Sequence, residues 1–111
     1  VLVDDTLHMW FWTADKVGHA TSMNGRNWTF TPDPVLEGTP QTWDEETVVI
    51  ADVIYIDSLY HAWYTGMNND VFAVGYATSS DGIEWEKLAD PVFAARINRS
   101  RIAIAMPFPA G

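Results

Sequence analysis

The chain has 111 residues, a formal net charge of −9 and no cysteine, and 48% of its residues are hydrophobic and 14% aromatic. This composition excludes a disordered or collagen-like chain, general nucleic-acid binding, which needs clustered lysine and arginine, and any disulfide or thiolate metal site. No apolar run approaches the roughly 20 residues that span a bilayer, so we expect one soluble domain with no membrane partner, in a compartment that the composition leaves open.

Two phrases of the first half recur in the second half. The phrase HMWF at 8–11 recurs as HAWY at 61–64, 53 positions later (61 − 8), and GHATSMNGRNW at 18–28 recurs as GYATSSDGIEW at 75–85, 57 positions later (75 − 18). The four extra residues fall in GMNNDV at 66–71, whose glycine, asparagine and aspartate predict a hairpin turn that tolerates insertion. A unit whose length varies only at a turn is typical of a structural repeat.

The pattern within each unit predicts short strands and no long amphipathic helix. β-Branched and aromatic residues predict strands at 48–56, 59–65, 72–78 and 85–88. Asp81-Gly82 and Asn24-Gly25 predict tight turns, after which Trp85 and Trp28 pack back on the strands. Four strands per unit are typical of a propeller blade, so we expect an all-β fold with about two propeller-type blades of four antiparallel strands per chain.

The end of the chain predicts one more strand, RIAIAMP at 101–107. Because Val1-Leu2-Val3 aligns with 54–56, the first blade lacks most of its innermost strand. We expect the tail strand, 100–108, to supply it to the first blade of its own or a neighbouring chain and so cover an exposed edge. The whole chain, 1–111, is then one propeller-type unit, with blade one at about 1–42 plus the tail strand and blade two at about 43–95.

The tail is also basic, with Arg96, Arg99 and Arg101, whereas residues 1–95 hold all fifteen acidic side chains. Two interpretations remain open. The tail is either a solvated basic turn or a segment that docks on an acidic surface of its own or a neighbouring chain.

The segment 43–93 resembles the repeat of the five-bladed propeller glycoside hydrolases, the arabinanase, xylosidase and invertase-like families. The matching phrases are WD, VIYID, YHAWYTG, GYATSSDGIEWEK and DPVF. Those propellers have five blades, whereas this chain has about two, and a propeller needs at least about four to close. We therefore expect a homo-oligomeric ring, of six blades from three copies or four from two. A monomeric two-blade sandwich and a fragment remain as alternatives.

The resemblance implies catalytic carboxylates on innermost strands. Ile50 stands where the family often has its innermost aspartate, and Met106 holds the equivalent place in the tail strand, so the catalytic residues remain unknown. Asp52 is the one charge within VVIADVIYI. It faces either solvent or the central channel, where copies from several chains would raise each other's pKa or bind a cation.

Trp43, Asp44, Glu45 and Glu46 place an indole beside carboxylates, a combination that stacks on a sugar and hydrogen-bonds to it. The alternative is a solvated acidic loop with a packed tryptophan. The candidate ligand-binding residues are therefore Trp43, Asp44, Glu45, Glu46 and Asp52. His8 and His61 recur in the repeat, which favours structural roles, and His19 is expected to pack as Tyr76 does.

These observations predict a carbohydrate-directed propeller module that binds sugar rather than hydrolysing it, assembled as a homo-oligomeric ring. No cofactor or resident metal is expected, and the expected partners are copies of the chain and carbohydrate. The alternative is a structural or assembly protein that retains a glycosidase-like scaffold without catalytic activity, as the residues Ile50 and Met106 suggest. A glycoside hydrolase with carboxylates contributed by different subunits is a third hypothesis.

Overall fold

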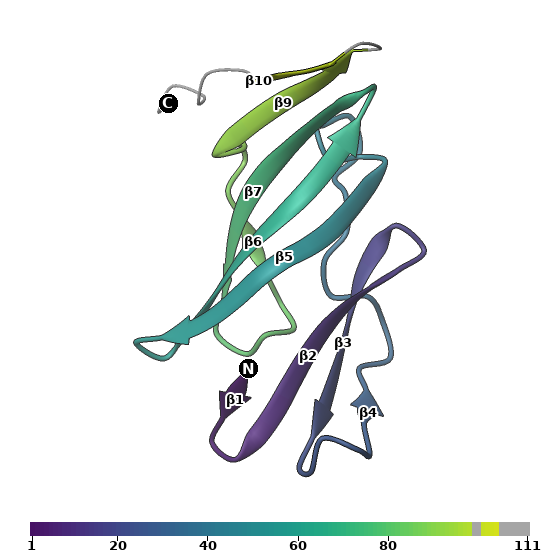
Figure 1. Ribbon diagram of the computed structural model, residues 1–111. Coiled ribbons are helices and arrows are strands. Elements are labelled where there is room, and N and C mark those ends of the chain that lie inside the picture. Colours follow the sequence, from purple (N-terminus) through teal and green to yellow (C-terminus); the bar gives the residue numbers. More distant parts are fainter. Residues whose placement is uncertain (99–100, 105–111) are drawn as a thin grey trace.

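A computed structural model describes residues 1–98 and 101–104 (Figure 1). The described residues form two antiparallel β-sheets and contain no helix, so none is long and apolar enough to cross a membrane. The two sheets lie side by side, with β2 and β3 in contact with β5 (Figure 1). The expected all-β, antiparallel fold is therefore confirmed.

Sheet one is formed by the first part of the chain and sheet two by the second part. The strands of sheet one, in spatial order, are β1 (Leu2–Val3), β2 (Thr6–Thr13), β3 (Lys16–Ser22) and β4 (Thr29–Phe30). Sheet two contains β5 (Thr47–Ile56), β6 (Leu59–Asn68), β7 (Val71–Ser79), β8 (Glu86–Lys87), β9 (Phe93–Asn98) and β10 (Arg101–Ile104). Both β8 and β9 pair with β7, at opposite ends of it. β8 lies within the predicted fourth strand, 85–88, whereas the sequence pattern did not predict β9.

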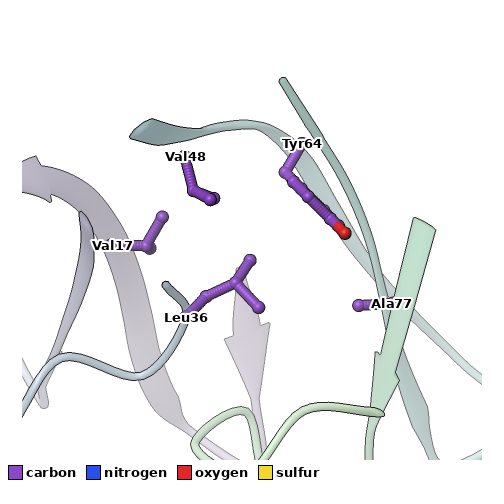
Figure 2. Close-up of a cluster of buried hydrophobic side chains, with 5 residues drawn as sticks. All are labelled: Val17, Leu36, Val48, Tyr64 and Ala77. Atoms are coloured by element: carbon purple, nitrogen blue, oxygen red, sulfur yellow. The ribbon is translucent and has the colours of Figure 1, made fainter. Parts of the chain in front are cut away.

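The core lies between the two sheets. Along β6 buried and half-buried residues alternate, so that Tyr60, Ala62 and Tyr64 face sheet one, as the period of a strand requires. Figure 2 shows the largest cluster, in which Leu36 lies between side chains from both sheets. The members of this cluster are Val17, Leu36, Val48, Tyr64 and Ala77.

The two sheets make the same backbone hydrogen bonds at positions 57 residues apart (88 − 31). The amide of Thr31 donates to the carbonyl of His19, and the amide of Leu88 donates to that of Tyr76, at 2.9 Å in both cases. The equivalent bonds from Val35 to Val17 and from Val92 to Val74 are both 2.8 Å long. In each sheet the short strand, β4 or β8, is therefore followed by a loop that returns to the edge of β3 or β7.

Four hairpin turns share one backbone conformation, with two successive residues at positive φ, which is the type I′ turn that matches the twist of antiparallel strands. These pairs are Asp4–Asp5, Ala14–Asp15, Asp57–Ser58 and Asn69–Asp70. Only Asn69 and Asp70 of the predicted turn segment 66–71 form a turn. β6 has 10 residues where β2 has 8, and β7 has 9 where β3 has 7. The four extra residues of the second unit therefore lengthen each strand of its hairpin by two. An even extension keeps every side chain on its own face, which explains why it is tolerated.

The described part of the tail lies on sheet two of its own chain, and donation to a neighbouring chain stays a prediction. Residues 101–104 pair with β9 in a local hairpin, not with sheet one of the same chain. A hairpin between neighbouring segments closes a much shorter loop than a return across the molecule, so its entropic cost is lower. Residues 99–100 and 105–108 of the predicted tail strand, including Met106, lie outside the described residues.

The turn at Ala14 offers a direct test of the hairpin. Ala14 is exposed and has φ 47°, a left-handed conformation that costs alanine about 1 kcal/mol more than asparagine. Ala14→Asn reproduces the Asn-Asp pair of the β6–β7 hairpin, and we expect the free energy of unfolding in urea to rise by about 1 kcal/mol. The matched control is Ala89→Asn, at an exposed residue without positive φ, where no gain is expected. Equal effects at both positions would contradict the assignment of strain at Ala14.

Candidate functional site

Asp44, one of the predicted ligand residues, is only 1% exposed and is surrounded by donors from its own chain. Its carboxylate accepts hydrogen bonds from the Thr39 amide at 2.9 Å, the Thr42 hydroxyl at 2.8 Å and the Tyr64 hydroxyl at 3.4 Å. Lys87 Nζ lies 2.7 Å from the same carboxylate. Burial acts to raise the pKa of Asp44, but the hydrogen bonds from Lys87, Thr39 and Thr42 outweigh it and hold this pKa below its usual value.

Trp43 packs beside this ion pair. Its indole stacks on the Tyr64 ring at 5.7 Å between centroids and donates a hydrogen bond to the carbonyl of Ala89 at 3.1 Å. Gly75 lies directly beneath both rings, because a Cβ at that position would meet Tyr64 and Trp43 within 2.8 Å. In sheet one the equivalents of Tyr64 and Lys87 are Phe11 and Phe30, which pack edge to face instead.

Glu45 and Glu46 are exposed at the start of β5, but both carboxylates also accept hydrogen bonds within the chain. Glu45 accepts one from the Gln41 amide at 2.7 Å, and Glu46 accepts one from the Asn69 amide at 3.1 Å. These bonds tie the loop before β5 to itself and to the β6–β7 hairpin. All four residues of the predicted Trp43–Glu46 group therefore have partners within the chain.

Asp52, the fifth predicted residue, lies at a β-bulge in the middle of β5. The pairing passes from Ile50 opposite Tyr64 to Asp52 opposite Trp63, which leaves Ala51 as the extra residue. Asp52 is exposed and lines a cleft of about 350 Å³ between β2 and β5. We call this the Asp52 cleft. Its wall also includes Trp10, Trp28 and His8.

The structure thus brings Asp52 together with two indoles and an imidazole, and it does not bring Asp52 together with the Trp43–Glu46 group, which surrounds the start of β5. Sequence reasoning assigned Trp28 only to packing and did not place Trp10 at a site. Alignment of HMWF with HAWY could have suggested an aromatic residue at this edge. Its proximity to Asp52 depends on how the two sheets meet.

The cleft lies along the open side of β2. β1 pairs with Thr6 and Leu7, and Val1 extends the pairing to His8, so within the described residues 9–13 of β2 have no strand on that side. Sheet two has the full-length β5 at the equivalent place.

The cleft combines one carboxylate with aromatic side chains. Two carboxylates must flank the bond in most glycoside hydrolases, and Asp52 is the one acidic side chain among the described residues that line the cleft. The described part of the chain also holds no group of three or more His, Asp or Glu side chains arranged around a metal ion. An indole and a carboxylate can instead stack on a sugar ring and accept hydrogen bonds from its hydroxyls.

Two histidines of sheet one contact each other beside Trp10, and one of them, His8, reaches sheet two. His8 Nδ1 and His19 Nε2 are 3.0 Å apart, and His19 Nδ1 is 2.7 Å from the Thr31 hydroxyl. His8 Nε2 lies 3.4 Å from the hydroxyl of Tyr60 in sheet two. Burial, and then the neighbouring His8, lower the pKa of His19 to about 4, and burial also lowers the pKa of His8. Both rings are therefore neutral at pH 7, and their contacts within the chain favour structural roles.

Comparison with known proteins gives a consistent class of relatives. No protein-family model matches the chain. The β-1,2-mannobiose phosphorylase of Thermoanaerobacter sp. (strain X514) is 30% identical over 79 residues, which covers 59% of this chain and 26% of that protein. The chain thus spans about a quarter of the length of this curated relative.

Solved structures support the same fold. A candidate glycoside hydrolase from Parabacteroides distasonis ATCC 8503 matches with a TM-score of 0.69 and 20% identity, over 96% of this chain and 40% of that chain. A glycosyl hydrolase from Bacteroides ovatus matches with a TM-score of 0.62 and 22% identity, over 83% and 30% of the two chains. The same values hold for a structure from the GH130 family of mannoside phosphorylases, which contains glycoside hydrolases that target β-1,2-mannosidic linkages in Candida mannan. The chain has a glycosidase-like, all-β fold.

The buried ion pair predicts a large effect at Lys87. Lys87→Met leaves the Asp44 carboxylate buried without its cation, and we expect a loss of about 3 kcal/mol in the free energy of unfolding at pH 7. Because the pKa of Asp44 is depressed in the folded wild type, its contribution is present above the unfolded pKa and is lost as pH falls through the folded pKa. The variant raises this pKa, so its deficit relative to wild type should shrink towards pH 4.

The matched control for this measurement is Lys16→Met. Lys16 and Glu37 form an exposed ion pair at 2.9 Å, with side chains 46% and 60% exposed, and its loss should cost about 0.5 kcal/mol or less. Equal effects of the two variants in urea unfolding would contradict the buried ion pair of Asp44 and Lys87.

The histidine contact predicts a pH dependence of stability. The folded pKa of His19 lies at about 4, below the ordinary value of 6.5, so between these values the unfolded chain binds more protons than the folded one. The free energy of unfolding should therefore fall as pH is lowered from about 6.5 to about 4. In His19→Phe the slope over this range should be smaller, whatever the absolute stability. An unchanged slope in a pH series of urea unfolding curves would contradict a neutral, buried His19.

Proposed function

We propose that this chain is a carbohydrate-directed β-propeller module and that the Asp52 cleft binds the sugar. The observation that carries this proposal is the presence of Asp52, Trp10 and Trp28 in the wall of one cleft of about 350 Å³. The cleft offers indole side chains beside a carboxylate that accepts hydrogen bonds from vicinal hydroxyls. The glycosidase-like fold supports a carbohydrate ligand by analogy.

The relatives suggest which sugar to test first. One is a β-1,2-mannobiose phosphorylase, and another structure comes from a family with members that target β-1,2-mannosidic linkages. We propose β-linked mannosides as the ligand class. Binding rather than cleavage is favoured because the cleft has one carboxylate and because Ile50, also in its wall, is apolar.

Asp52 is the proposed direct contact among the five predicted residues. Trp43, Asp44, Glu45 and Glu46 would have to give up existing hydrogen bonds to meet a ligand. We propose that these four residues support the fold around the start of β5.

The module is proposed to act as part of a homo-oligomeric ring. Two blades cannot close a propeller, and each blade needs a neighbour to bury its faces. In such a ring the tail strand of an adjacent chain is the proposed donor to the open edge of β2, beside the Asp52 cleft.

The second candidate is a structural or assembly protein that retains the scaffold without sugar binding. The residue Ile50 favours it, because it stands where the five-bladed propeller glycoside hydrolases often have their innermost aspartate. This candidate needs no ligand in the Asp52 cleft.

Glycan binding separates the two candidates. On a glycan array and by titration calorimetry with β-1,2-mannobiose, the wild type should bind, and Asp52→Asn should weaken binding about tenfold or more, because a charged hydrogen bond is worth about 1.5–3 kcal/mol. Glu45→Gln is the control, since it changes an exposed carboxylate outside the cleft, and its affinity should be unchanged. Silence of the wild type on the array and with a panel of aryl-glycosides would favour the assembly protein.

A further inference from the structure

The contact between the two sheets is centred on one indole. Trp10 of sheet one donates a hydrogen bond from Nε1 to the carbonyl of Gly82 at 2.9 Å. Its ring lies edge-on to Trp85 and Tyr60, at 6.1 and 5.7 Å between centroids. The same Gly82 carbonyl accepts a second hydrogen bond, from Trp85 Nε1 at 3.1 Å. Sheet two therefore presents a formed site for an indole at the Gly82 turn.

Sheet one contains the same turn at Gly25. Gly25 and Gly82 have φ of 78° and 81°. The amide of each glycine donates a hydrogen bond of 2.8 Å to the hydroxyl of the serine three residues earlier, Ser22 or Ser79. Trp28 Nε1 donates to the Gly25 carbonyl at 3.2 Å, as Trp85 does to that of Gly82. The Gly25 turn thus reproduces the acceptor side of the contact.

The Gly25 turn lacks the indole. A Cβ placed on Gly82 would lie 3.0 Å from the Trp10 ring and 3.7 Å from Tyr60. At Gly25 the neighbour within 4 Å, among the described residues, is Leu7 at 3.5 Å, in the place that Tyr60 takes at Gly82. At the Gly82 turn, Trp10 donates a hydrogen bond to the glycine carbonyl. The Gly25 carbonyl can accept a hydrogen bond at the same position.

The matching indole lies on the opposite side of the molecule. Trp63 pairs with Tyr76 across β6 and β7 as Trp10 pairs with His19 across β2 and β3. Beside it, His61 Nδ1 and the Tyr76 hydroxyl are 2.6 Å apart, in the place of the His8–His19 contact. Trp63 alternates with Ala62 and Tyr64, which are buried against sheet one, so it lies on the far face of sheet two and is half-buried.

We propose that a second copy of this chain docks head to tail, with Trp63 of one copy at the Gly25 turn of the next. This contact would repeat the one inside the chain. The donor of that contact, Trp10, recurs as Trp63, 53 residues later. Its acceptor turn at Gly82 recurs at Gly25, 57 residues earlier and on the opposite outer face of the molecule. Such a contact is heterologous, so it builds a closed ring or an open fibre. This proposal rests on the proposed homo-oligomer and names its interface.

Each copy carries one donor surface and one acceptor surface, which allows a sharp test. The mass of the full chain is measured by sedimentation velocity over a range of concentrations at 0.15 M salt, which screens the repulsion between chains of charge −9. The wild type should form a multiple of 12.5 kDa. Trp63→Ala on the donor side and Leu7→Arg on the acceptor side should each raise the dissociation constant about 30-fold or more.

Mixing the two variants is the decisive step. Trp63→Ala keeps its acceptor turn and Leu7→Arg keeps its donor face, so an equimolar mixture should give a dimer that neither variant forms alone. Trp12→Ala removes an exposed indole elsewhere on β2 and should leave the mass of the wild-type assembly unchanged. Circular dichroism checks folding, and Trp63→Phe, which keeps a ring but loses the N–H donor, should give an intermediate dissociation constant.

The outcomes separate this interface from the proposals on which it rests. A monomeric wild type at every concentration would overturn both the ring and this interface, while the glycan experiment with Asp52→Asn would stand. An oligomer that neither variant weakens, or a mixture that forms no dimer, would overturn this interface alone. Binding of β-1,2-mannobiose lost in Trp63→Ala but kept in Asp52→Asn would assign the Trp63 face to sugar instead of to a second copy.

Discussion

The hydrogen bond from Trp10 to the Gly82 carbonyl is the contact on which the arrangement of this chain depends. Each sheet alone has one apolar face and would leave it in water, and stacking buries the face of sheet two that bears Tyr60 and Tyr64. Many apolar contacts could bury that area, but a directional bond to a single carbonyl admits one orientation of the sheets. The position of the Asp52 cleft follows from this orientation.

The second constraint is the buried pair of Asp44 and Lys87, which joins the loop before β5 to the outer strand of sheet two. A buried carboxylate is tolerated only with partners that satisfy its oxygens, and this one has a cation, an amide and hydroxyl groups. In sheet one the corresponding positions are Phe11 and Phe30, which pack as rings. The two units therefore share backbone hydrogen bonds but differ in how their outer strands are anchored.

Three surfaces carry the proposals for sugar binding and self-association: the Asp52 cleft, the Gly25 turn and the Trp63 face. The Asp52 cleft lies between β2 and β5, and the bulge at Ala51 alters the β5 strand beside it. The Gly25 turn and the Trp63 face are the two halves of a contact that is already present once in the chain. The two proposed surfaces meet at Trp28, which lines the Asp52 cleft and donates a hydrogen bond to the Gly25 carbonyl.

Much of the fold could be predicted from the sequence alone, because turns and strand alternation are local properties. Asn69–Asp70 and Asp81-Gly82 favour tight turns through their own backbone preferences, and the alternation around Tyr64 indicates which face of β6 is buried. The candidate site could be predicted only in part. Asp52 was recognisable as a charge within an apolar strand, whereas the burial of Asp44, the bulge at Ala51 and the approach of Trp28 to Asp52 depend on contacts between residues distant in the sequence. Only the tertiary structure decided them, since the packing of one sheet on the other determines which polar groups lose water and which line a cleft.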